Sequence, residues 1–103
     1  MSEYRVLMNK YKHLVIRKDD GVEVYNDIKS HLDKGEVVIV DFSDIDTMTT
    51  YFAKQVFGKL YTQMGQEEFS RKVKFDKRYV TEDLDLVLSI GIAAAISDMQ
   101  NGL

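Results

Sequence analysis

A run of apolar, mostly β-branched residues in the middle of the chain constrains the fold more than any other feature. The run is Val37-Val38-Ile39-Val40, and Asp41 and Phe42 follow it. Consecutive β-branched residues favour a strand, and the lack of alternation with polar residues predicts burial on both faces, as in a central parallel strand. Residues 36–42 are therefore predicted to form the central strand of an α/β unit.

An amphipathic helix is predicted just before this strand, over residues 21–33. Its apolar residues recur at helical spacing: Val24, Tyr25, Ile28 and Leu32. Asp20 and Glu23 have the spacing of a capping box, which predicts an N-cap at Asp20. Gly35 is predicted to stop the helix.

The same two periodicities predict the remaining elements. These are strands at 4–8, 13–16 and 71–76, helices at 50–64 and from residue 81, and a short helical turn at 66–70. The predicted order is β-β-α-β-α-β-α. We therefore expect an α/β fold (α+β by some definitions), with one mixed sheet of about four strands packed against about three helices. Residues 1–103 are expected to form a single domain.

The charges are ordered along the chain although the net charge is only −3. Residues 1–18 and 71–78 are basic, and residues 19–46 between them are strongly acidic. Nucleic-acid-binding domains usually carry one dominant positive face, whereas this chain is acidic overall. The order favours solvated surface or a charged protein-docking surface over nucleic-acid binding.

Catalysis, metal binding and cofactor binding have little support in the sequence. The chain has no cysteine, no Gly-rich phosphate-binding motif and no G-x-S-x-G nucleophile motif. His13 and His31 belong to different predicted elements, and His31 is expected to be exposed. Asp41, Asp44 and Asp46 suggest a divalent cation site, but their spacing fits no phosphatase-like or EF-hand pattern. We expect turn-forming acids, no catalytic or metal-binding residue and no cofactor.

No predicted segment has the length of a membrane span. The longest apolar run, Ile90–Ile96, has seven residues, whereas a bilayer span needs about 20. We therefore expect a cytoplasmic protein with no membrane contact.

The hydroxyl-rich segment 47–51, Thr-Met-Thr-Thr-Tyr, immediately precedes the predicted helix at 50–64. One interpretation is structural, because a threonine hydroxyl there caps free N–H groups of the helix. The other is functional, because a phosphate at a helix N-terminus changes a docking surface without unfolding the protein. Both interpretations stay open on the sequence alone.

The segment from Val37 to Ala53 resembles the central strand, loop and helix of STAS domains, the fold of anti-sigma factor antagonists. With the F-G-K-L-Y motif at 57–61 and the segment 69–75, it is similar to a small bacterial and phage family of STAS-like domains of unknown function. The resemblance covers about residues 20–95. It implies a non-enzymatic domain that binds a regulatory partner.

In anti-sigma factor antagonists this loop carries a D-S-S-G-L motif, whose second serine is phosphorylated by a partner that is both kinase and anti-sigma factor. By position, Met48 matches the apolar residue before the motif, and Thr49 matches the aspartate. Thr50 matches the first serine and Tyr51 the phosphorylated one. The chain therefore departs from the motif at the acceptor itself, and Thr49 and Thr50 are the alternative acceptors.

The resemblance places the partner-binding surface on the loop before the helix and on the exposed side of that helix. The candidate residues are Ser43, Asp44, Asp46, Thr47, Thr49, Thr50, Tyr51, Lys54, Gln55 and Lys59. The implied partner is a histidine-kinase-like ATPase or another protein regulator.

Two other functions remain open. One is a phage-type small inhibitor or accessory protein that uses the same fold on an unrelated protein target. The less favoured one is nucleic-acid binding through the basic segment 71–78. A homodimer through edge pairing of the strand at 71–76 is also open, although its lysines oppose such pairing.

Overall fold

A computed structural model describes residues 2–10 and 18–101 of the chain. The predicted strand at 13–16 and His13 lie outside the described residues. Within them, the order of sheet and helix segments is β-α-β-α-β-α, as expected for an α/β domain once the strand at 13–16 is set aside.

The sheet has three described strands in the order β1-β2-β3. They are β1 (Glu3–Leu7), β2 (Val37–Asp41) and β3 (Val73–Phe75). Both pairs are parallel, with Tyr4 opposite Val38 and Val38 opposite Val73. The expected mixed sheet of about four strands is therefore wrong for the described residues. A helical crossover lies between β1 and β2 and another between β2 and β3, and each returns the chain in the same direction.

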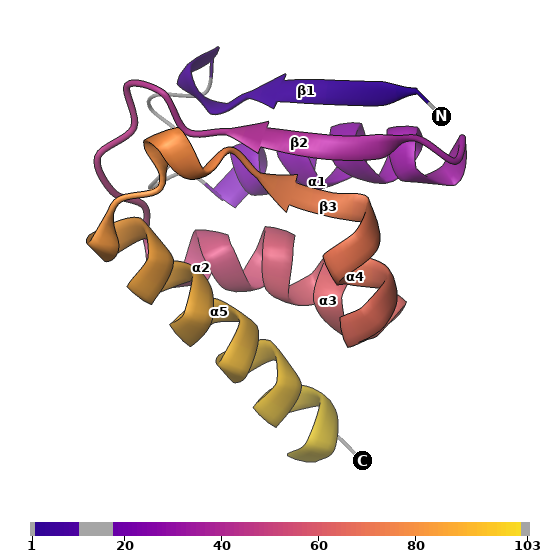
Figure 1. The fold of residues 1–103 in the computed structure, drawn as a ribbon. Coiled ribbons are helices and arrows are strands. Elements are labelled where there is room, and N and C mark those ends of the chain that lie inside the picture. The colour runs from indigo at the N-terminus through magenta and orange to yellow at the C-terminus, as the bar shows by residue number, and fades with distance from the viewer. Residues whose placement is uncertain (1, 11–17, 102–103) are drawn as a thin grey trace.

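Helices cover one face of this sheet (Figure 1). Val38 and Val40 of β2 point to the helices and are fully buried, whereas Val37 and Ile39 on the other face are half-buried. The prediction that β2 is buried on both faces is therefore wrong. The unbroken β-branched run predicts burial on both faces, but the described helices shield only every second residue.

Four helices are described, if α2, η2 and α3 are counted as one continuous helix. They are α1 (Lys18–Asp33), the continuous helix formed by α2 (Thr50–Ala53), η2 (Lys54–Gly58) and α3 (Lys59–Met64), then α4 (Gln66–Lys72) and α5 (Glu82–Asn101). About three were predicted, and α4 is the additional one, where a short helical turn was expected. A short 3-10 segment, η3 (Lys77–Tyr79), precedes α5.

The two ends of α1 show one incorrect and one correct prediction. The helix already includes Asp20, because it begins at Lys18, so the predicted N-cap at Asp20 is wrong. Gly35 does stop the helix, with φ of 84°. Its N–H donates to the carbonyl of Leu32 at 2.9 Å, and the N–H of Glu36 donates to His31 at 3.1 Å. These two bonds form a Schellman motif, in which glycine takes the left-handed conformation without strain.

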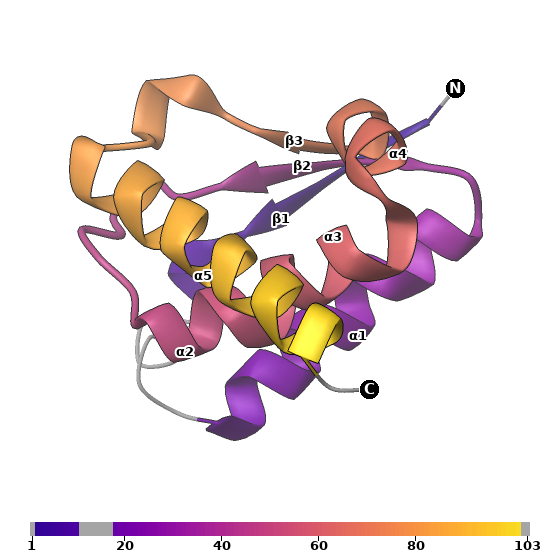
Figure 2. The same ribbon diagram turned by 90° about the horizontal axis from the view of Figure 1, so that it is seen from below.

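The middle of the continuous helix, η2, is π-helical. The N–H of Lys59 reaches back to the carbonyl of Lys54, five residues earlier. η2 lies between α1 and α5 and packs against both (Figure 2). A wide turn of this kind was not predicted, since the apolar spacing over 50–64 fits an ordinary helix.

The core lies between the sheet and this layer of helices. Phe42, Phe57 and Phe75 form an aromatic cluster, with the Phe57 and Phe75 ring centroids 5.3 Å apart. α5 crosses η2 closely because Gly58 of η2 and Gly91 of α5 lie against each other at the crossing. A Cβ on Gly58 would lie 2.7 Å from the Cβ of Ala95, which is shorter than van der Waals contact allows.

Candidate functional site

The loop between β2 and α2 is anchored by two apolar side chains and presents its polar ones. Ile45 and Met48 are buried in the core. The N–H of Ile45 donates to the carbonyl of Phe42 at 2.9 Å, and Asp44 takes φ of 66°, so the chain turns sharply there. The remaining polar residues point outward: Asp44, Asp46 and Thr47 are exposed, and Ser43 is half-buried.

Of the hydroxyls before the helix, Thr49 serves as the cap. Its Oγ1 accepts a hydrogen bond from the N–H of Phe52 at 3.0 Å. The expectation that one threonine of this segment caps the helix is confirmed. Thr50 follows in the first turn and is exposed, as is Tyr51.

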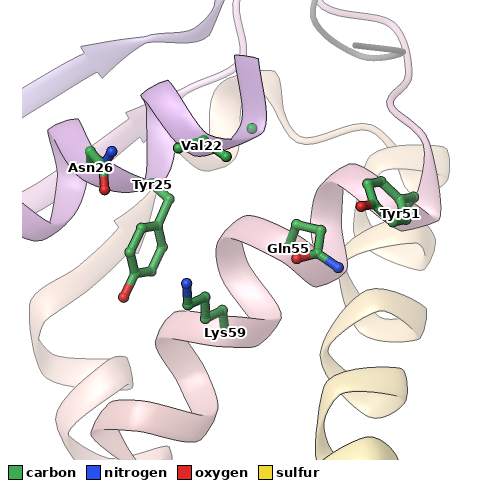
Figure 3. Close-up of a pocket in the computed structure, with 7 residues that line it drawn as sticks. Val22, Tyr25, Asn26, Tyr51, Gln55 and Lys59 are labelled. Carbon is green, nitrogen blue, oxygen red and sulfur yellow. The ribbon is translucent and has the colours of Figure 1, made fainter. Parts of the chain in front are cut away.

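Tyr51, Gln55 and Lys59 lie along one exposed side of the continuous helix, beside a hollow of about 100 Å³ between that helix and α1 (Figure 3). On the α1 side the hollow is lined by Gly21, Val22, Tyr25 and Asn26. Tyr51 is 50% exposed and Val22 is 56% exposed, so both side chains are open to solvent beside the hollow. We name these seven lining residues the α1–α2 surface.

Tyr25 is held at the centre of the α1–α2 surface by two contacts. The ammonium of Lys59 lies 4.3 Å from the centroid of its ring, within the range of a cation–π interaction. Its hydroxyl donates to Oε1 of Gln63 at 2.5 Å. The α1 residues of this surface were not predicted, because the helical spacing of Tyr25 with Val24, Ile28 and Leu32 does not link it to the segment at 50–64.

Lys54 lies on the other side of the same helix. It forms an ion pair with Asp98 of α5. There it lines a second hollow of about 360 Å³ with Thr62, Ala95 and Met99, and Gln55 and Lys59 reach both hollows. Tyr51 therefore lines only the first hollow and Lys54 only the second, whereas Gln55 and Lys59 line both.

The three aspartates that suggested a cation site do not converge. Asp41 is buried, and its carboxylate accepts from the N–H of Ser43 and from Nη1 of Arg5, both at 2.8 Å. Asp44 and Asp46 are exposed on the loop. Over residues 2–10 and 18–101, no three histidine or acidic side chains are grouped as metal ligands.

Arg5 joins Asp41 to Asp76 and so ties all three strands together at one end of the sheet. Its Nη1 lies 2.9 Å from Oδ2 of Asp76, which also accepts from Arg78 at 2.7 Å. The hydrogen bonds from Arg78 and then from Arg5 lower the pKa of Asp76 far below its usual value. Burial acts to raise the pKa of Asp41, but the hydrogen bonds from Ser43 and Arg5 outweigh burial and the pKa is lowered.

A second polar cluster surrounds His31, which was expected to be exposed and is half-buried. Its ring stacks on Tyr4 with centroids 3.5 Å apart, and its Nδ1 lies 2.7 Å from Oε1 of Glu36. The hydroxyl of Tyr4 donates to Asp27 at 2.7 Å. The two contacts of Tyr4, with His31 and with Asp27, connect β1 to the last turns of α1.

The fold and the exposed surfaces together define a class: a compact α/β domain whose parallel sheet is covered by helices on one face. No described helix has the length and apolar character that crossing a membrane requires. The chain belongs to the family described as STAS-like domain of unknown function (DUF4325), whose model matches residues 20–77. No curated protein and no solved structure shows a significant match to the chain. The resemblance to this family is therefore confirmed, and the matched residues include α1 from Asp20 onward, β2, the loop, the continuous helix, α4 and β3.

Proposed function

We propose that the chain is a non-enzymatic regulatory domain that binds another protein through the loop 43–51 and the α1–α2 surface. The observation that carries this proposal is the exposed aromatic ring of Tyr51, which lies at the rim of a hollow in the α1–α2 surface. Aromatic side chains beside small hollows are frequent anchors of protein interfaces. The polar loop residues next to it would form the solvated rim.

The preferred partner is an ATPase- or kinase-like regulator, as for the anti-sigma factor antagonists that the loop resembles. Thr50 is the position at which charge would control this binding. Its side chain is exposed, and its neighbour Thr49 is engaged in the cap. A negative charge in the first turn is compatible with the helix dipole, so Thr50→Glu would change the surface and leave the fold intact.

The test is a quantitative pull-down from the native host with four forms of the chain: wild type, Thr50→Glu, Tyr51→Ala and Ser89→Glu. Ser89 is exposed on α5, away from the proposed surface, so Ser89→Glu controls for the added charge. We expect one protein that wild type and Ser89→Glu retain and that the other two variants lose. The purified pair should then bind with a fixed stoichiometry by calorimetry. Equal capture by all four forms would contradict the proposal.

The alternative is a small phage-type inhibitor that uses the acidic loop on an unrelated protein target. The exposed carboxylates of Asp44 and Asp46 favour it, since they form no ion pair with any described residue. The double variant Asp44→Lys/Asp46→Lys separates the two functions. It should abolish binding to a target that recognises an acidic surface, whereas Thr50→Glu should leave that binding unchanged.

Nucleic-acid binding through residues 71–78 is the least favoured function. Two of its five basic residues are already neutralised, because Arg71 pairs with Glu68 and Arg78 pairs with Asp76. Binding that depends steeply on salt concentration would be the sign of this function.

A further inference from the structure

The outer side of β3 is a free sheet edge in the described part of the chain. β3 pairs with β2 and with no other described strand, and it is the outer strand in Figure 1. The N–H of Asp76 donates to the carbonyl of Val40 at 2.9 Å. Because backbone groups of successive residues turn to opposite sides of a strand, the N–H and C=O of Phe75 face away from β2. They are available to a further strand.

A hollow of about 360 Å³ lies beside this edge, between β3, α4 and α5. Half of its lining residues are large and apolar: Phe69, Val73, Phe75 and Leu88. Val73 and Phe75 point to the helical side of the sheet, as do Val38 and Val40, their partners in register. An apolar side chain of an added strand, pointing to the same side, would enter this hollow.

The charge around the hollow is positive. Lys74 and Lys77 line it, both are exposed, and neither forms an ion pair with an acidic residue that the structure describes. The ammonium of Lys74 is held by the carbonyl of Ser70 at 2.7 Å. Asp85 is the single acidic residue of the lining. The hollow therefore combines an apolar floor with two lysines and one carboxylate, so the charge of its lining is positive on balance.

We propose that the free edge of β3 and the adjacent hollow bind an extended acidic segment of another protein, which adds a strand to the sheet. The backbone of the segment pairs with Phe75, and one of its apolar side chains fills the hollow. Its carboxylates meet Lys74 and Lys77. A second copy of this chain fits poorly, because antiparallel pairing of two β3 strands would bring their lysines together. The α1–α2 surface takes no part in this binding.

The experiment begins with a displayed library of random peptides selected on the full chain. We expect the enriched peptides to alternate apolar and acidic residues. Lys77→Glu should weaken their binding by about tenfold, since an attraction becomes a repulsion. Lys34→Glu is the matched control, because Lys34 is also exposed and unpaired among the described residues, and it should leave the affinity unchanged.

N-methylation of an enriched peptide tests the pairing itself. In a strand added to a sheet edge, only every second N–H of the peptide donates to the edge. Methylation of those amides should abolish binding, whereas methylation of the amides between them should leave binding unchanged. Tyr51→Ala should not alter the affinity, which keeps this result separate from the proposed regulatory function.

Three results would overturn the proposal. The first is a selection that enriches no peptide. The second is an equal affinity of the peptides for Lys77→Glu and wild type. The third is an N-methylation series in which the loss of binding does not alternate along the peptide. A single-stranded oligonucleotide that displaces the peptides and depends equally on Lys77 would assign the edge to nucleic acid instead.

Discussion

Gly91 of α5 faces Ala53 of α2 so closely that a Cβ on Gly91 would lie 2.6 Å from the Cβ of Ala53. The same Cβ would lie 2.8 Å from the backbone N of Lys54, which cannot move without distorting the helix. The crossing of α5 over the continuous helix therefore requires glycine at this position.

Gly91→Ala is expected to destabilise the fold, although alanine is the better helix former. Overpacking costs about 1–3 kcal/mol, which exceeds the gain of about 1 kcal/mol in helix propensity. Urea unfolding of Gly91→Ala and of Ser89→Ala, an exposed position on the same helix, measures the difference. A Gly91→Ala variant as stable as wild type would show that the two helices separate easily.

Thr49→Ala should cost about 1 kcal/mol of stability, because it leaves the N–H of Phe52 without its cap. Thr50→Ala should change the free energy of unfolding by only a few tenths of a kcal/mol, because the side chain of Thr50 does not cap the helix. Thr49→Ser retains the hydroxyl and should restore most of the loss. Thermal unfolding of the three variants measures these values, and equal losses at 49 and 50 would contradict the assignment of the cap.

Stability should fall as the pH is lowered toward 2. The pKa values of Asp41 and Asp76 are lowered in the folded state. The unfolded chain therefore binds protons first, near the ordinary aspartate pKa of about 3.9. The contribution of both carboxylates is present above that pH and is lost as the pH falls through their folded pKa values.

Asp76→Asn should flatten this pH dependence, because it removes one of the two carboxylates while retaining a similar shape. Urea midpoints between neutral pH and acid would measure the effect. Asp83→Asn is a suitable control, since Asp83 is exposed. An unchanged slope in Asp76→Asn would mean that the Arg5 and Arg78 contacts do not persist in solution.

Phe42→Ala should remove a large part of the total stability. Phe42 is fully buried, and its ring lies 6.0 Å from that of Phe75 and 6.1 Å from that of Phe57. Truncation of a buried phenylalanine costs about 3–5 kcal/mol, against a total of about 5–15 kcal/mol for small domains. Leu86→Ala, at a position 58% exposed, should cost far less. Chemical denaturation would check both values.

Local patterns predicted most of the elements. The β-branched run marked β2, and Gly35 marked the end of α1 through a motif that depends on adjacent residues. The start of α1 was misplaced, because Asp20 and Glu23 have capping-box spacing inside a helix that already began at Lys18. Spacing alone does not distinguish a cap from a first turn.

Long-range contacts were not predictable in the same way. Arg5 and Asp76 are 71 residues apart in sequence, and their contact depends on the order of the strands. The α1–α2 surface has the same origin, since Tyr25 and Lys59 lie on helices that meet only through the fold. Tyr51, Gln55 and Lys59 were predicted as candidates because they share one segment. The α1 residues of the same surface show no sequence pattern that links them to this segment.

The wide turn η2 determines which residues share a face of the continuous helix. A regular α-helix turns by about 100° per residue. The eight-residue separation of Tyr51 and Lys59 would then leave Lys59 about 80° away from the side that carries Tyr51. A π-helical turn takes up about one additional residue, which brings Lys59 back to within about 20° of Tyr51 and over the ring of Tyr25. Deletion of one residue from 54–58 would therefore allow a regular α-helix and still keep Lys59 within about 20° of Tyr51, whereas a regular α-helix of unchanged length would turn Lys59 about 80° away and dismantle the α1–α2 surface.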